Sequence, residues 1–327
     1  MTHPYLIEIQ PNVFGFVGEH PSIKHLCKII EHLASSDASV NIQGESGTGK
    51  EFTARALHDY SFRKENLFIA SNCGVFTESL LEAELFGAEK GRATGVDAYP
   101  GLLEQAHNGT LFLDEITEMP PRVQVALLRA LQERKIVRIG GVASKPRDTN
   151  FRLVTASSRK LEGLLREDFY YRIVQVPIQV PSLRDRGSDI ELLSKYFCGK
   201  ESEKSGKEFY LYGDAINTLS NYHWPGNIRQ LENSIIRACA LYGVDEEDKD
   251  NILYTRHFEF LNEENFNADN SLNGRSDLEK GLIIENLKIF SGNISETAKT
   301  LGLPRSVLHY KLKKYKIDIN DYRPNSD

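Results

Sequence analysis

The stretch SVNIQGESGTGKEFTARALHDY, at residues 39–60, contains an apolar strand pattern, a glycine-rich loop and a helical run in direct succession. Its loop matches the G-x-x-x-x-G-K pattern of a phosphate-binding loop in the required strand–loop–helix context. Glycines let the backbone wrap closely around phosphate oxygens, and the following helix N-terminus adds positive potential. Lys50 is expected on the β- and γ-phosphates. We therefore expect a set of eight consecutive residues to bind ATP: Gly44, Glu45, Ser46, Gly47, Thr48, Gly49, Lys50 and Glu51.

A second motif, GTLFLDEI at residues 109–116, places two carboxylates at the end of an apolar strand. The ends of parallel strands line the same crevice as the phosphate loop. We interpret Asp114 as a ligand of Mg²⁺ and Glu115 as the base that polarises an attacking water. Position 51 is Glu, where phosphate loops usually carry Ser or Thr, so metal contact has to depend on this acidic pair or on water. Taken alone, the pair would be better explained as a solvated helix start, and the upstream phosphate loop is what favours catalysis.

The apolar pattern of the first half of the chain predicts an α/β fold with a parallel sheet and helices on both faces. Helical spacing at 25–33 and 123–133 alternates with five predicted strands, at 39–43, 67–71, 109–116, 151–157 and 174–180. From Asp189 to about Leu241 only helical patterns remain. The predicted parts are a tail at 1–14, an α/β core at 15–180, a helical lid at 181–243, an acidic, Asn-rich linker at 244–276 and a small all-α domain at 277–327. Within the linker, YTRHFEFL at 254–261 could pack locally.

The C-terminal part has the pattern of a helix-turn-helix. A helix over about 293–301 ends in a Gly-containing turn, and a second helix runs from Arg305 to Tyr315. From Lys299 to Lys316, both included, there are six Lys or Arg residues and no acidic ones, which indicates a DNA-binding surface. The expected base readers are Arg305, Ser306, His309 and Tyr310, and the expected phosphate contacts are Lys311, Lys313 and Lys314. A helical hairpin with a solvated basic face is the alternative.

Composition sets limits on the remaining function classes. The chain has 327 residues, of which 40% are hydrophobic and 26% charged, as in ordinary globular proteins. We find no secretory pattern and no apolar run of the roughly 20 residues that span a bilayer. Four scattered cysteines without a C-x-x-C pair indicate reduced thiols in a cytoplasmic protein. The net charge of −6 excludes a uniform coating of nucleic acid but not a local basic patch.

With these motifs assembled, the chain resembles the AAA+ ATPase domain of bacterial sigma-54-dependent activators, also called enhancer-binding proteins. The resemblance covers roughly residues 14–242, and the C-terminal unit resembles a Fis-type domain. The matching strings are GESGTGKE at 44–51, SNC with ESLLEAELFGAEKG at 71–91, GTLFLDEI at 109–116, LLRALQE at 127–133, REDFYYRI at 166–173, LRDR at 183–186, WPGNIRQLEN at 224–233 and LHYKLKKY at 308–315.

The resemblance implies a hexameric or heptameric ring with ATP at the subunit interfaces. For this chain we expect a homo-oligomer, from a dimer to a hexameric ring. In that frame, Asn72 resembles the residue that couples the nucleotide state to Glu115. Arg166 and Arg172 resemble the arginines that reach the neighbouring subunit's ATP, and Arg229 resembles the lid arginine that senses the nucleotide.

Three features depart from the family pattern. The loop that contacts sigma-54 usually reads G-A-F-T-G-A, whereas this chain has Gly91, Arg92, Ala93, Thr94, Gly95 and Val96. Ala93 therefore removes the aromatic tip of that loop. Ser158 stands where Asn is usual, and the segment before Arg166 is several residues shorter. Only about 14 residues precede the ATPase, so we expect regulation by a separate protein or a small molecule rather than by a fused receiver domain.

The sequence supports a DNA-bound transcription regulator that hydrolyses ATP and acts on RNA polymerase, resembling the sigma-54 class. A second hypothesis is a non-remodelling regulator that binds ATP and acts independently of sigma-54, because GRATGV replaces GAFTGA. A chaperone-like AAA+ ATPase is a third, and it leaves the basic helix-turn-helix unexplained.

Overall fold

The computed structural model describes residues 11–89, 98–140, 145–244 and 250–261, together with positions 284, 287, 290, 294–300, 308, 312 and 317. The chain divides into two units, residues 1–257 and residues 258–327. Among the helices of these described residues, none is long and apolar enough to cross a membrane.

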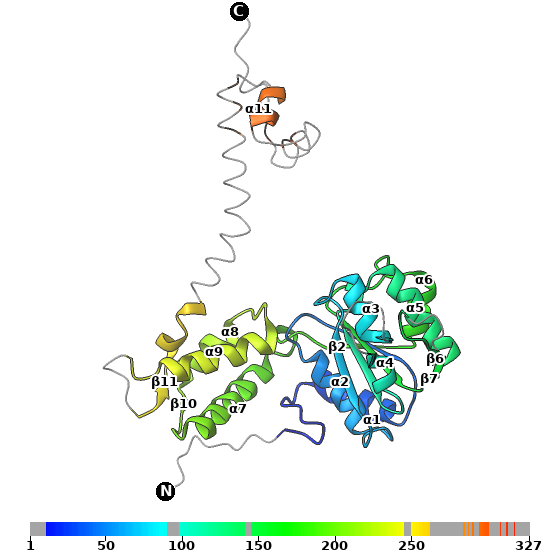
Figure 1. Ribbon diagram of the computed structural model, residues 1–327. Coiled ribbons are helices and arrows are strands. Elements are labelled where there is room, and N and C mark those ends of the chain that lie inside the picture. The colour runs from blue at the N-terminus through cyan, green and yellow to red at the C-terminus, as the bar shows by residue number, and fades with distance from the viewer. Residues whose placement is uncertain are drawn as a thin grey trace, which may run out of the picture. The chain divides into compact units, whose positions relative to one another are not determined.

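A five-stranded, fully parallel sheet forms the centre of the first unit and confirms the predicted α/β class (Figure 1). Its strands lie in the order β2 (Phe68–Asn72), β5 (Thr110–Asp114), β8 (Arg152–Ser157), β1 (Val40–Gln43) and β9 (Val176–Gln179). Each was predicted from its apolar run. Because all five strands run the same way, their carboxyl ends meet at one edge, where the glycine loop follows β1 and the acidic pair follows β5.

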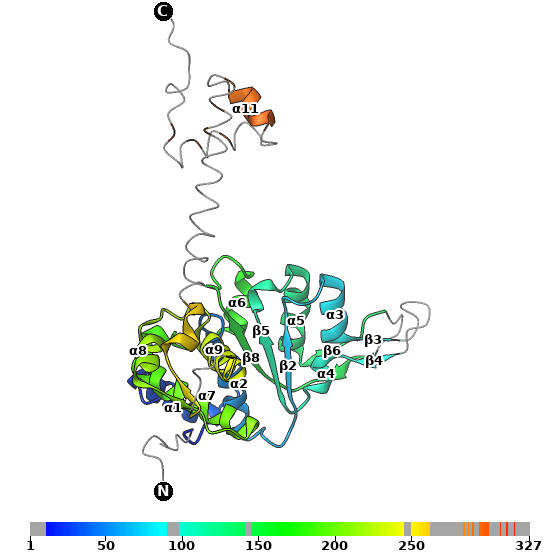
Figure 2. The ribbon, with the colours of Figure 1, turned by 90° about the vertical axis from the view of Figure 1, so that its left-hand side faces the viewer.

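Side-chain alternation along the strands divides the core into two layers. In β5, Phe112 packs with one cluster, whereas Leu111 and Leu113 pack with the other. The first cluster is covered by the helices α1 (Pro21–Ala34) and α2 (Lys50–Asp59), and the second by α3 (Glu78–Phe86), α5 (Pro121–Glu133) and α6 (Glu167–Ile173). Figure 2 shows α1 and α2 on one side of the strands and α3 and α5 on the other. Both faces of the sheet are therefore buried, as expected for a parallel sheet.

Two short antiparallel ribbons extend from the second face. Strand β3 (Gly87–Ala88) pairs with β4 (Tyr99–Pro100), and β6 (Lys135–Ile136) pairs with β7 (Arg147–Asp148). Between them lie a short helix α4 (Leu102–Gln105) and, after β5, the 3₁₀ helix η1 (Ile116–Glu118).

The lid consists of the 3₁₀ helix η2 (Arg184–Arg186) and the helices α7 (Ser188–Ser205), α8 (Gly213–Asn221) and α9 (Asn227–Leu241). Two predictions are corrected here. The region is not purely helical, since β10 (Tyr210–Leu211) pairs with β11 (Ile252–Leu253). Strand β11 also lies inside the predicted linker, so this part of the linker is folded against the lid and is followed by a 3₁₀ helix η3 (Thr255–Phe258). Two-residue strands carry no periodic signal, which explains why the sequence pattern missed them.

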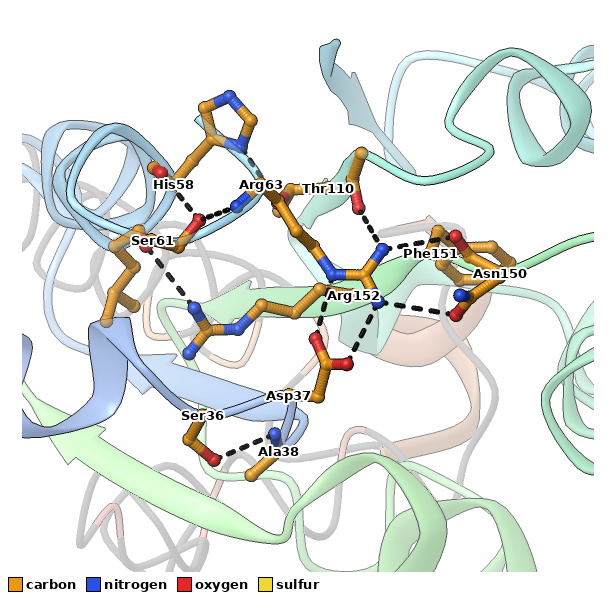
Figure 3. A network of polar contacts seen from close by, with 12 residues as sticks. Ser36, Asp37, Ala38, His58, Ser61, Arg63, Thr110, Asn150, Phe151 and Arg152 are labelled. Atoms are coloured by element: carbon orange, nitrogen blue, oxygen red, sulfur yellow. Dashed lines mark hydrogen bonds and ion pairs between the residues drawn. The ribbon is translucent and has the colours of Figure 1, made fainter. Parts of the chain in front are cut away.

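At the opposite edge of the sheet, a polar network joins the starts of the strands to α1 and α2 (Figure 3). Arg152 is almost fully buried and donates to the carbonyl oxygens of Leu33 at 2.7 Å and Leu57 at 3.3 Å. Arg63 donates to both carboxylate oxygens of Asp37, at 2.8 and 3.0 Å. These bonds attach the two helices to the sheet at the edge opposite the loop and the acidic pair.

In the second unit, helix α11 (Ile294–Thr300) lies within the predicted first helix of the helix-turn-helix. Four buried residues form a small apolar cluster there: Leu287, Ala298, Leu308 and Leu312. Three of them lie in the two helices that the sequence predicts, Ala298 in the first and Leu308 and Leu312 in the second.

Candidate functional site

The glycine loop turns sharply between β1 and α2. Gly47 and Gly49 have φ angles of +78° and +99°, which side chains rarely tolerate, so glycine is required at both positions. Helix α2 begins at Lys50, directly after the loop. The first-turn N–H groups of a helix have no partners within it, so the loop ends at a site suited to anions.

Lys50 lies against the loop and is only 7% exposed. Its Nζ donates to the carbonyl oxygens of Gly44 at 3.0 Å and Glu45 at 3.3 Å, and lies 3.7 Å from Glu115 Oε1. The ammonium group is therefore held between the phosphate loop and the acidic pair, which is where a triphosphate would need positive charge.

The acidic pair occupies the end of β5 in a constrained backbone. Glu115 has a φ of +47°, unusual for a residue with a side chain, and its N–H donates to Asp114 Oδ1 at 2.9 Å. Burial raises the pKa of the Asp114 carboxyl, an effect that the N–H bond and Lys50 partly oppose. Glu115 Oε2 accepts hydrogen bonds from Ser158, 2.8 Å from the hydroxyl and 3.2 Å from the backbone N–H. The carboxylate of Glu115 is thus held by Ser158 after β8 on one oxygen and by Lys50 near the other.

Asn72 lies at the end of β2, where it is paired in register with Asp114. Its Oδ1 accepts a hydrogen bond from Gly74 N at 2.8 Å. Within the described part of the chain, the partners of the Glu115 carboxylate are Ser158 and Lys50, and no bond joins it to Asn72. Asn72 therefore lies at the same edge of the sheet as Glu115. In the described residues, no direct contact between the two side chains accounts for the expected coupling.

The lid meets the phosphate loop through the start of α9. Gly47 O accepts the N–H groups of Ile228 at 3.0 Å and Arg229 at 3.3 Å. The Arg229 side chain reaches Ser46 Oγ at 3.4 Å. Arg229, which the resemblance predicts to sense the nucleotide, therefore lies beside the phosphate loop.

Sequence reasoning missed two further lid residues at this contact. Arg184 forms a two-point ion pair with Glu45, and Asn227 Nδ2 donates to Glu45 Oε2 at 3.1 Å. The hydrogen bonds from Arg184 and Asn227 lower the pKa of the Glu45 carboxyl to about 2. The only sequence signals were an acidic residue inside a phosphate loop, which needs a cationic partner, and the segments LRDR and WPGNIRQ.

Arg166 directly precedes α6, and Arg172 lies in the last turn of this helix. Arg166 forms a two-point ion pair with Asp168, at 2.9 and 3.1 Å, and its side chain is about half exposed. Arg172 Nη2 donates to Leu131 O at 2.8 Å. In the described residues, these contacts do not bring either guanidinium to the phosphate loop of its own chain, which is compatible with a role toward a neighbouring subunit.

Several predicted positions lie outside the described residues. These are the polymerase-contact loop, Gly91, Arg92, Ala93, Thr94, Gly95 and Val96, and the DNA-contacting set Arg305, Ser306, His309, Tyr310, Lys311, Lys313 and Lys314. The strands β3 and β4 that flank the polymerase-contact loop are described. Arg147 of β7 forms ion pairs with Glu89, directly after β3, at 3.1 Å and with Glu104 of α4 at 3.6 Å.

The chemistry of this edge fits a nucleoside triphosphate with a hard divalent cation. The described residues contain no group of three or more His, Cys, Asp or Glu side chains that could hold a metal alone. Mg²⁺ in phosphoryl-transfer sites usually takes one or two carboxylates plus substrate phosphates, and Asp114 supplies one such carboxylate.

A parallel sheet with this strand order, a phosphate loop, an acidic pair and a helical lid defines the AAA+ class. Comparison with family models agrees. Residues 16–179 match the sigma-54 interaction domain, residues 184–265 the AAA+ ATPase lid domain, and residues 274–315 the bacterial regulatory proteins of the Fis family. The chain belongs to the family of sigma-54-dependent transcriptional regulators with an AAA+ domain and a Fis-type helix-turn-helix.

Relatives support this assignment. The chain is 39% identical to a signal-transduction and transcriptional-control protein of Clostridium beijerinckii, over 93% of this chain and 49% of that protein. It is 40% identical to the nitrogen fixation protein AnfA of Azotobacter vinelandii, over 94% and 58%, and 40% identical to the transcriptional regulatory protein ZraR of Salmonella typhimurium, over 92% and 69%. The chain thus spans about half the length of the first two of these curated relatives.

Among solved structures, NtrX from Brucella abortus in complex with ADP and in complex with ATP is 33% identical, with a TM-score of 0.69 over 92% of this chain and 70% of that chain. RuvB from Thermotoga maritima, at 14% identity and a TM-score of 0.54 over 94% of this chain and 91% of that chain, shares the fold alone.

Proposed function

We propose that this protein is a DNA-binding transcription regulator that binds and hydrolyses ATP to act on the sigma-54 form of RNA polymerase. The main support for this proposal is an arrangement of side chains beside the glycine loop. At the carboxyl edge of one parallel sheet lie four of them: Lys50, Asp114, Glu115 and Ser158. Membership of the sigma-54 family and the similarity to nucleotide-bound NtrX support it.

Each side chain has a distinct task in this proposal. Lys50 contacts the β- and γ-phosphates, and Glu115 accepts a proton from the water that attacks the γ-phosphate. Ser158 keeps the Glu115 carboxylate in position. Asp114 holds Mg²⁺, which would neutralise charge on the phosphates when bound. Arg229 senses the nucleotide from the lid, beside Ser46.

The active form is proposed to be a homo-oligomer, with a ring as the largest form. Arg166 and Arg172 then act on the ATP of the adjacent subunit, where a guanidinium stabilises charge on the transferred phosphoryl group. Their position on α6, away from the chain's own loop, supports this assignment. Asn72, next to Asp114 in the sheet, is proposed to link the nucleotide state to Glu115.

The C-terminal unit is proposed to attach the regulator to DNA. Arg305, Ser306, His309 and Tyr310 would read base edges, and Lys311, Lys313 and Lys314 would contact phosphates. We place the protein in the cytoplasm, where these partners are found, with a separate protein or small molecule as its regulator.

The sequence of the contact loop supports a second candidate function. Ala93 replaces the aromatic residue of the usual GAFTGA loop, which removes apolar area from the proposed polymerase contact. In this alternative, the protein binds ATP and DNA but regulates transcription without remodelling sigma-54 polymerase.

One experiment separates these functions. ATP turnover by the purified protein is measured with and without sigma-54 holoenzyme on a pre-melted promoter, and open-complex formation is scored in parallel. Turnover coupled to opening supports the first function. Turnover without opening, together with opening after Ala93→Phe, supports the alternative. No turnover in any condition contradicts the proposed ATPase.

A further inference from the structure

We propose that Arg184 and Asn227 are positioning residues that hold the lid against the phosphate loop through Glu45, and that nucleotide affinity depends on this contact. We name these three side chains the lid latch. The inference rests on the proposed ATP site, and it assigns roles to two lid residues that lie outside the phosphate loop and the acidic pair.

The first step is the geometry of the latch. The Arg184 guanidinium contacts both oxygens of the Glu45 carboxylate, with Nη1 2.8 Å from Oε2 and Nη2 bonded to Oε1. Asn227 Nδ2 donates to Glu45 Oε2 at 3.1 Å and to Ser46 O at 3.0 Å. A two-point arginine–carboxylate contact fixes both distance and orientation, which a single hydrogen bond does not.

The second step is that the two lid residues are themselves joined. Asn227 Oδ1 accepts the N–H of Leu183 at 2.9 Å, so the start of α9 is bonded to the segment that carries Arg184. Asn227 is fully buried and has a φ of +53°. A strained, buried asparagine whose donor and acceptor groups are both in use is held in one conformation by its surroundings.

The third step is the close fit of the two backbones behind the latch. Gly47 O accepts the N–H groups of Ile228 and Arg229, and a Cβ added to Gly47 would lie 2.3 Å from Gly226 O. No side chain fits between the loop and the lid at this point. A change in the lid's position therefore moves the loop as well. The latch also fixes the position of the backbone from which the Arg229 side chain extends.

The fourth step is the charge of Glu45. A carboxylate within a loop that binds a triphosphate repels the phosphates unless a cation neutralises it. Arg184 supplies that cation, and the low pKa of Glu45 keeps the carboxylate charged throughout the range of an ordinary assay. Removing Arg184 alone should therefore be worse for nucleotide binding than removing Glu45 alone.

The experiment measures the dissociation constant of an N-methylanthraniloyl derivative of ADP by fluorescence titration, using the full chain. Arg184→Gln is expected to weaken binding about tenfold, since it breaks the latch and exposes an uncompensated charge. Glu45→Gln is expected to weaken binding about twofold to threefold, because one amide hydrogen bond can still form. The double variant is expected to bind about threefold more tightly than Arg184→Gln, a rescue that loss of folding cannot produce.

Two controls accompany these variants. Arg138→Gln breaks a comparable, partly buried two-point pair with Glu104 of α4 and should leave binding unchanged. The melting temperature of each variant shows whether it folds. The inference is overturned when Arg184→Gln binds the probe within twofold of the wild type, or when the double variant binds no better than Arg184→Gln. ATP turnover is scored separately, so a wild type that binds the probe without hydrolysing ATP contradicts the proposed function alone.

Discussion

Ser158 Oγ lies 2.8 Å from Glu115 Oε2, so a hydroxyl at the end of β8 orients the carboxylate at the end of β5. The family usually carries Asn at this position, whose longer side chain could reach a phosphate or a water. The shorter serine bonds the Glu115 carboxylate directly instead. The backbone N–H of Ser158 donates to the same carboxylate oxygen at 3.2 Å, so two hydrogen bonds from one residue fix its position.

We predict that Ser158→Ala lowers kcat for ATP about tenfold while the KM changes less, because the substitution misorients Glu115 without removing it. Ser158→Asn should retain most of the activity, since an amide can also donate to the carboxylate. Steady-state ATP hydrolysis measures both variants. A kcat for Ser158→Ala within twofold of the wild type would show that the hydroxyl does not position Glu115.

We predict that Gly47→Ala weakens binding of the ADP probe more than about tenfold, since the new Cβ would lie 2.3 Å from Gly226 O and force the loop from the lid. Gly163→Ala is the matched control. Gly163 has a similar φ of +76°, but a Cβ at this position would have no atom within 4 Å, so the control tests the backbone strain without the clash. Equal losses of binding in the two variants would contradict the close loop–lid contact.

Asp37 allows a prediction on acid stability. The hydrogen bond from Arg63 lowers the pKa of the Asp37 carboxyl in the folded state. The pair therefore stabilises the fold above the unfolded pKa of about 3.9 and loses this effect as the pH falls through the folded pKa. Asp37→Asn should cost about 1 kcal/mol at pH 7, a value reduced for the half-exposed carboxylate. The difference from the wild type should shrink below about pH 4.

Urea unfolding at a series of pH values measures this effect. Glu191→Gln, which breaks the exposed pair of Glu191 with Lys195, is the control and should change stability by less than about 0.5 kcal/mol. A constant destabilisation by Asp37→Asn down to about pH 2 would mean that the charge of Asp37 does not contribute.

For the DNA-binding unit, we predict that Lys313→Ala weakens binding similarly for all DNA sequences and reduces the slope of log K against log salt by about 0.9, as expected for one lost phosphate contact. Arg305→Ala should instead lower the discrimination between operator and unrelated DNA. Titration of labelled duplexes at several salt concentrations measures both effects. An unchanged salt slope for Lys313→Ala would remove it from the phosphate-contacting set.

The sequence predicted the features that have a local signature. An apolar run followed by a glycine loop indicated β1 and its loop, and the run before Asp114 indicated β5, because burial on both faces of a parallel sheet produces continuous apolar strands. The α/β class and the strand positions followed from such runs.

Contacts between distant residues could not be predicted in this way. Arg184 and Glu45 are 139 positions apart, and no periodicity links an exposed arginine of a short turn to a loop carboxylate. Strands β10 and β11 were missed for a related reason, since two residues are too few to alternate. The bond from Ser158 to Glu115 needed the strand order, which places β8 beside β5.

The most direct test of the proposed ATPase compares the wild type with Glu115→Gln, which keeps the shape of the side chain but removes its basicity. We predict that ATP turnover falls about 10²–10⁴-fold, as expected for loss of a general base, while the ADP probe binds within about threefold of the wild type. Turnover by Glu115→Gln above about a tenth of the wild-type rate would contradict the assignment of Glu115 as the base and with it the mechanism proposed for this site.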